Sequence, residues 1–106
     1  MMKSKFRVTL KFSGMINGPF ILEKEKTIIG RGSKSDIVII NDSLSRQHLL
    51  LEIIEGKLYL TDLGSSNGTK IADQQIPTNE KTLYDTFFMP IEIGIGVNLI
   101  VEEGFF

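Results

Sequence analysis

The chain has 106 residues, of which 42% are hydrophobic, enough for one hydrophobic core but too few for two ordinary domains. Its 12 basic and 13 acidic residues give a formal net charge of -1 and are mixed along the sequence, so no broad field favours nucleic acid or an anionic membrane. The chain has no cysteine, which excludes a disulfide framework and a thiolate metal site. It has neither an apolar signal run nor a spanning stretch of about 20 apolar residues. We therefore expect one cytoplasmic domain over residues 1–106, with its core at about 6–101.

Alternating apolar and polar residues predict the first strands. Residues 6–12 alternate with a period of two, which buries one face of a strand. Turn residues at 13–14 and 17–19 follow, and we expect a second strand to open at Phe20 and run through the charged residues 23–26 to Ile29.

The rest of the chain continues as short strands. The β-branched run 37–40 favours a strand, and 48–54 and 57–61 are predicted to form a hairpin around Glu55-Gly56. Shorter candidates lie at 69–71, around Ile76, and at 81–83, 91–95 and 97–101, and Pro90 argues against a central strand at its own position. No window longer than about ten residues has helical periodicity. These patterns predict an all-β, antiparallel β-sandwich with its ligand loops at one end.

Three polar loops carry the candidate chemistry, at residues 30–32, 45–48 and 64–68. Arg31 and Arg46 supply planar forks that match phosphate oxygens, Ser45 and Ser66 supply hydroxyls, and the amide of Asn67 can both donate to and accept from a peptide backbone. Charge-assisted hydrogen bonds of this kind contribute about 1.5 to 3 kcal/mol each. The pattern favours the binding of an anion over bond-breaking chemistry.

These loops resemble a known family. The blocks Gly30-Arg31, Ser45-Arg46-Gln47-His48 and Asp62-Leu63-Gly64-Ser65-Ser66-Asn67-Gly68-Thr69 closely resemble, in residues, order and spacing, those of the forkhead-associated domain, a β-sandwich that binds phosphothreonine peptides. The resemblance covers nearly the whole chain. It departs from the family at Ala72, where an asparagine is usual, and at 83–90, where a Leu-x-x-Gly-Asp block is replaced.

The resemblance implies a role for each matching residue. Arg31 and Ser45 would bond the phosphate, with Arg46 assisting. Asn67 would hold the peptide main chain, and Ser66 would help to form the pocket for the threonine methyl group. The architectural residues would be Gly30, His48 and Gly68. No residue is expected to be catalytic, to bind a metal or to hold a cofactor.

Other readings are weaker. Residues 30–35 superficially resemble a nucleotide phosphate loop, but no glycine directly precedes Lys34 and a strand, not a helix, is expected next. Ser45, His48 and Asp62 are the residue types of a hydrolytic triad, without an identifiable nucleophile turn or oxyanion site. A nucleic-acid-binding barrel would need a basic face interleaved with stacking aromatics.

A fold of this kind used for assembly without phosphate remains the alternative function. Residues 87–89 and Phe105-Phe106 would then form a contact surface, or else would plug the end of the sandwich. The preferred prediction is a non-enzymatic module that binds a phosphothreonine-containing protein, or a phosphorylated tail of its own parent chain, and neither nucleic acid nor membrane. We expect it to be the N-terminal module of a longer signalling protein.

Overall fold

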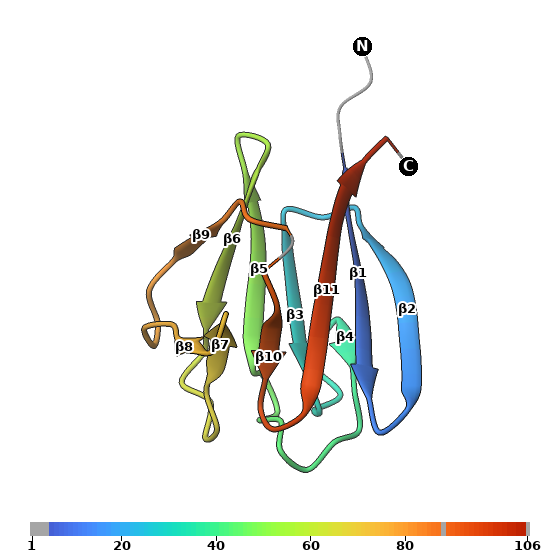
Figure 1. Ribbon diagram of the computed structural model, residues 1–106, viewed down its shortest axis with the longest axis vertical. Coiled ribbons are helices and arrows are strands. Elements are labelled where there is room, and N and C mark those ends of the chain that lie inside the picture. The colour runs from blue at the N-terminus through green and yellow to red at the C-terminus, as the bar shows by residue number, and fades with distance from the viewer. Residues whose placement is uncertain (1–4, 88, 106) are drawn as a thin grey trace.

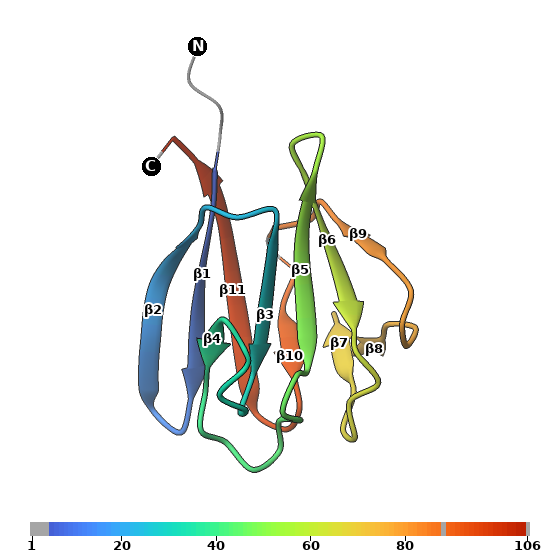
Figure 2. The same cartoon turned by 180° about the vertical axis from the view of Figure 1, so that it is seen from behind.

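The computed structural model describes residues 5–87 and 89–105 of the chain. These residues form two β-sheets packed face to face, which Figures 1 and 2 show from opposite sides. No helix in this part of the chain is long and apolar enough to cross a membrane. The strands are β1 (Lys5–Phe12), β2 (Met15–Leu22), β3 (Lys26–Gly30), β4 (Ile37–Val38), β5 (Leu49–Ile54), β6 (Lys57–Asp62), β7 (Thr69–Ile71), β8 (Gln74–Gln75), β9 (Thr82–Tyr84), β10 (Ile91–Ile93) and β11 (Val97–Gly104).

The two sheets have the strand orders β2-β1-β11-β10-β7-β8 and β4-β3-β5-β6-β9. The short edge strand β4 runs parallel to β3, with Ile29 opposite Ile37, whereas β3, β5, β6 and β9 are antiparallel neighbours. The predicted antiparallel β-sandwich is therefore confirmed, with one short parallel pair at an edge.

The core lies between the sheets and follows from the period-two alternation. In β1, Val8 and Leu10 are fully buried, and their partners in β11, Val101 and Leu99, are 2% exposed. Burying one such side chain stabilises the fold by about 1.5 to 3 kcal/mol.

The predicted second strand is wrong. Residues 20–22 belong to β2 and residues 26–29 to β3, which lie in different sheets, because the chain crosses the sandwich between Leu22 and Lys26. The predicted turn at 17–19 lies inside β2, where the register against β1 shifts between Val8 and Leu10 and the Gly18-Pro19 peptide bond is cis. Because β2 is an edge strand, a proline within it breaks no central ladder.

Phe87 and Met89 pack against the core instead of forming an exposed contact surface. The ring of Phe87 lies 5.9 Å from that of Phe6 and 5.5 Å from that of Tyr84, measured between centroids. The Tyr84 hydroxyl donates to the Met89 carbonyl at 2.7 Å. Phe105 is 68% exposed. Phe88 and Phe106, named in the same expectation, lie outside the described residues.

Candidate functional site

The three polar loops meet at one end of the sandwich, the lower end in Figure 1. The backbone joins the first two: the Arg31 amide donates to the Ser45 carbonyl at 3.1 Å, and the Gly32 amide donates to the Arg46 carbonyl at 3.0 Å. The amide of Leu63 donates to the His48 carbonyl at 2.9 Å, which ties in the third loop. Strand ends therefore hold the loops in fixed relative positions.

Gly30 permits the close approach of the first two loops. A Cβ atom at this position would lie 2.2 Å from the Arg46 carbonyl oxygen and 2.8 Å from Ser35 Oγ. That space is occupied by a hydrogen bond from Ser35 Oγ to the Arg46 carbonyl at 2.6 Å. Any side chain at Gly30 would push the loop that carries Ser45 and Arg46 away from β3.

His48 is completely buried and links the second loop to the third. Its Nδ1 accepts from the Ser45 amide at 3.1 Å, and its Nε2 lies 2.8 Å from the Gly68 carbonyl oxygen. Because an amide only donates and a carbonyl only accepts, these contacts fit the neutral imidazole with its proton on Nε2. The Gly68 carbonyl also accepts from the Gly94 amide at 3.0 Å, which attaches the β10-β11 turn.

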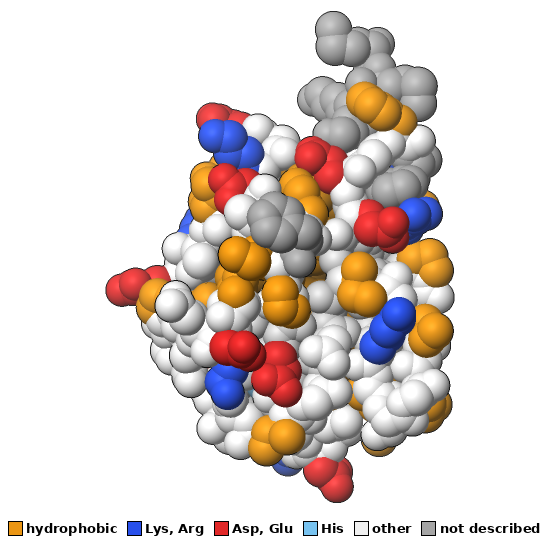
Figure 3. Space-filling view, in the orientation of Figure 1, with side chains coloured by type: hydrophobic (Ala, Val, Ile, Leu, Met, Phe, Trp, Pro, Cys, Tyr) orange, Lys and Arg blue, Asp and Glu red, His pale blue; other side chains and the backbone are white. Residues whose placement is uncertain are grey.

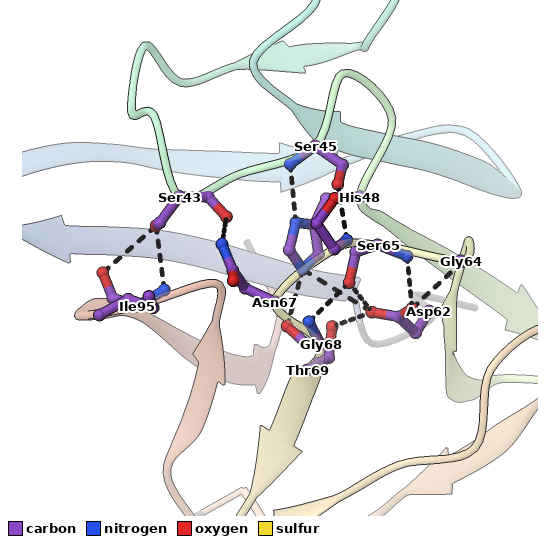
Figure 4. A network of polar contacts seen from close by, with 11 residues as sticks. Ser43, Ser45, His48, Asp62, Gly64, Ser65, Asn67, Gly68, Thr69 and Ile95 are labelled. Carbon is purple, nitrogen blue, oxygen red and sulfur yellow. Dashed lines mark hydrogen bonds and ion pairs between the residues drawn. The ribbon is translucent and has the colours of Figure 1, made fainter.

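Asp62 organises the third loop from beneath (Figure 4). One carboxylate oxygen accepts from Ser65 Oγ and Thr69 Oγ1, both at 2.7 Å, and the other from the amides of Gly64 at 3.1 Å and Ser65 at 2.9 Å. Burial acts to raise the pKa of this carboxyl, but the hydrogen bonds from Ser65 and Thr69 outweigh it, so its pKa lies below the ordinary value. The network holds residues 64–68 in a defined shape.

Ser45 and Asn67 tie the second and third loops together at the surface. Ser45 Oγ accepts from the Ser66 amide at 3.0 Å, which leaves the hydroxyl hydrogen to donate elsewhere. Asn67 Nδ2 donates to the Ser43 carbonyl at 2.9 Å, and Ser43 Oγ accepts from the Ile95 amide at 2.9 Å (Figure 4). Ser66 and Asn67 are both exposed.

An open pocket of about 910 Å³ lies beside Ser45. Arg31 is held at its edge by a hydrogen bond from Nε to the Leu44 carbonyl at 2.7 Å, and within the described part of the chain its two terminal nitrogens have no protein partner. The pocket is lined by Arg31, Gly32, Ser33, Lys34, Ser45, Arg46, Gln47, Leu63 and Asn79. It thus contains the three predicted phosphate ligands, whereas Ser66 and Asn67 lie outside its lining.

Sequence reasoning missed several residues of this end. Lys34 and Asn79 line the pocket, and Asp62 and Ser65 support the third loop from within. For Asp62 a local signal existed, because an aspartate whose side chain accepts from amides two and three residues later is typical of a tight turn. Lys34 carried no such signal, because a single lysine in a loop has no periodicity.

The geometry differs from that of a hydrolytic triad. Ser45 meets His48 through its backbone amide, and its hydroxyl faces the Ser66 amide instead. His48 Nε2 points to the Gly68 carbonyl, 3.7 Å from Asp62 Oδ1. Residues 30–35 are followed by β4 and not by a helix, unlike a nucleotide phosphate loop.

A rigid β-sandwich that presents cations, hydroxyls and an amide on joined loops at one end is the architecture of a recognition module. The family model of the FHA (forkhead-associated) domain matches residues 27–88. The chain belongs to this family of interaction modules, which confirms the resemblance seen in the sequence.

Two curated proteins are similar to this chain in sequence. The oxoglutarate dehydrogenase inhibitor of Corynebacterium efficiens is 36% identical over 64 residues, covering 60% of this chain and 44% of that protein. The FHA domain-containing protein FhaB of Mycobacterium tuberculosis is 32% identical over 82 residues, covering 76% of this chain and 51% of that protein. The chain therefore spans about half the length of the curated relatives it matches.

Solved structures agree on the fold. One, from a structural and functional analysis of phosphothreonine-dependent FHA domain interactions, is 26% identical with a TM-score of 0.71, covering 91% of this chain and 95% of that one. The yeast splicing factor Pml1 shares the fold at 19% identity with a TM-score of 0.81, covering 97% of this chain and 82% of that one.

Proposed function

We propose that this domain binds phosphothreonine in an extended peptide and has no catalytic activity of its own. The observation that carries the proposal is the pairing, in one open pocket, of the Arg31 guanidinium with the Ser45 hydroxyl. The Ser45 oxygen already accepts a hydrogen bond from Ser66, so its hydrogen is available for an anion. Arg46 lines the same pocket and would add a second guanidinium.

A phosphate suits these groups better than a carboxylate. A phosphorylated threonine carries about -1.5 to -2 charges at pH 7 and three acceptor oxygens, enough to engage both an arginine fork and a hydroxyl. Because the net charge of the chain is only -1, the attraction must come from these local cations rather than from a general field.

The peptide main chain would lie along the third loop. The hydrogen bond from Asn67 Nδ2 to the Ser43 carbonyl fixes the orientation of the Asn67 side chain. Its Oδ1 can then accept a hydrogen bond from a peptide amide. Ser66, exposed beside it, would help to receive the threonine methyl group. Gly30, His48 and Gly68 would act beneath the site by holding the loops together, in keeping with their buried contacts.

The partner we propose is a phosphothreonine-containing signalling protein in the cytoplasm, or a phosphorylated tail of the same parent chain. The solved structure that shares 26% identity comes from work on phosphothreonine-dependent interactions, which supports the same ligand class here. Among the described residues, the pocket lining contains no aromatic side chain, so it offers no platform on which a nucleic-acid base could stack.

The test is capture from degenerate peptide libraries centred on phosphothreonine, phosphoserine or unmodified threonine. Wild type is expected to select the phosphothreonine library, and Arg31→Ala to lose that selection. Arg7→Ala is the matched control, because Arg7 pairs with Glu102 on β11, away from the site. Equal capture of all three libraries, or capture of none, would contradict the proposal and favour a phosphate-independent assembly domain.

A further inference from the structure

The pocket beside Ser45 carries more positive charge than one phosphate needs. Arg31, Lys34 and Arg46 all line it, and of the residues that the structure describes no aspartate or glutamate does. On the face drawn in Figure 3, by contrast, acidic and basic side chains are interspersed. The pocket is therefore a local concentration of cations on a chain whose net charge is -1.

Within the described part of the chain, these cations have no carboxylate partner. Elsewhere on the chain, Lys24 pairs with Asp36 at 2.5 Å and Arg7 pairs with Glu102 at 3.1 Å. In the described residues, no carboxylate lies within ion-pair distance of Lys34 or Arg46. Like charges held near one another repel, so an anion that enters between them is favoured twice, by attraction and by relief of repulsion.

The positive charge of the pocket exceeds the negative charge of a single phosphothreonine. One phosphothreonine brings about -1.5 to -2 charges, which Arg31 and Arg46 together balance. Lys34 is left over, with the amides of Gln47 and Asn79 in the same lining as further hydrogen-bond donors.

We infer that the peptide ligand carries a second anionic group that enters this pocket and pairs with Lys34. The group is either the carboxylate of an aspartate or glutamate or the phosphate of a second phosphorylated residue. This inference rests on the proposed function, because it assumes that a phosphothreonine occupies Arg31 and Ser45. The second group lies on the pocket side of Ser45, away from Asn67, which is outside the lining.

The experiment is a positional scan by fluorescence anisotropy at physiological ionic strength. A phosphothreonine peptide with alanine at every flanking position is the reference. A single aspartate or a single phosphoserine is then placed at each flanking position in turn. Wild type, Lys34→Ala and a control, Lys57→Ala, are compared. Lys57 is exposed at the start of β6, next to the β5-β6 turn, which lies at the opposite end of the sandwich from the pocket loops (Figure 1).

At one or more positions, an acidic residue should tighten binding to wild type about threefold or more, as a partly exposed ion pair does. Lys34→Ala should abolish that gain, so that the acidic peptide and the all-alanine phosphopeptide bind this variant with affinities within about twofold of each other. The Lys57→Ala control should behave as wild type. A gain from aspartate identifies a carboxylate as sufficient, whereas a gain from phosphoserine alone identifies a second phosphate.

Failure of this inference and failure of the proposed function would give different results. If phosphothreonine binding is normal but no acidic position tightens it, or Lys34→Ala keeps the gain, the second anionic group is refuted and the proposed function stands. If no peptide binds in a phosphothreonine-dependent way, the proposed function fails and the inference fails with it. Lys34→Glu adds a check, since it should reverse the preference toward a lysine at the same position.

Discussion

Replacing Asp62 with asparagine tests whether the buried carboxylate holds the third loop in place. The substitution keeps the shape of the side chain but removes the charge to which four hydrogen bonds are made. A hydrogen bond to a charged group contributes about 1.5 to 3 kcal/mol, against about 0.5 to 1.5 kcal/mol for a neutral one.

The four bonds therefore weaken by about 4 kcal/mol together, at about 1 kcal/mol each. The lower cost of burying a neutral amide offsets part of this loss. We expect Asp62→Asn to lower the free energy of unfolding by about 2 kcal/mol, which for a domain of this size lowers Tm by about 10 °C.

Urea unfolding followed by intrinsic tyrosine fluorescence or circular dichroism would measure the change. Asp85→Asn is the matched control, because Asp85 is exposed and should change the stability by less than about 0.5 kcal/mol. A loss of less than about 0.5 kcal/mol in Asp62→Asn would show that the carboxylate network does not hold the loop.

Four further predictions follow from the same structure. Because the folded-state pKa of Asp62 is lowered, its stabilising contribution is full above the unfolded pKa of about 3.9 and is lost as the pH falls through the folded pKa. The stability gap between wild type and Asp62→Asn should therefore be constant from about pH 5 to 7 and narrow below about pH 4, and a gap that widens in acid would oppose this. Gly30→Ala should cost about 1 to 3 kcal/mol and weaken phosphopeptide binding, since its Cβ would meet a carbonyl oxygen at 2.2 Å; unchanged chemical denaturation would contradict the packing. Phe87→Ala should cost about 3 kcal/mol by calorimetry, whereas Phe105→Ala, at an exposed ring, should cost less than about 0.5 kcal/mol. Asn67→Ala should weaken phosphopeptide binding with little change in Tm, and if it melts the domain instead, Asn67 is structural.

The sequence predicted the sandwich because alternation is a local property. Val8 and Leu10 face the core in β1 simply because every second residue of that strand is apolar. The boundary between β2 and β3 could not be read in the same way. Charged residues at 23–26 suit either an exposed strand or a crossing between sheets, and the choice depends on distant partners: β1 for β2, and β5 for β3.

The site could be predicted only in part, for a related reason. The family blocks located Arg31, Ser45 and Arg46, and the structure places all three in one pocket. Their roles stay predictions, as do those of Ser66 and Asn67. The role of Asp62 was predicted neither from its local turn signal nor from its side-chain partners, because Ser65 and Thr69 reach its carboxylate only once the loop has folded. The packing of Phe87 against Phe6 likewise depends on the tertiary fold.

The most direct test of the central claim is an NMR titration of the amide signals of the ¹⁵N-labelled domain with N-acetyl-phosphothreonine amide. We expect shifts confined to residues 31–34, 43–47 and 64–68, saturable for phosphothreonine and absent for N-acetyl-threonine amide at the same concentration. Arg31→Ala should remove them. Shifts that are centred on β2 or on β11, or that are equal for the unphosphorylated compound, would contradict the claim that this end of the sandwich recognises phosphothreonine.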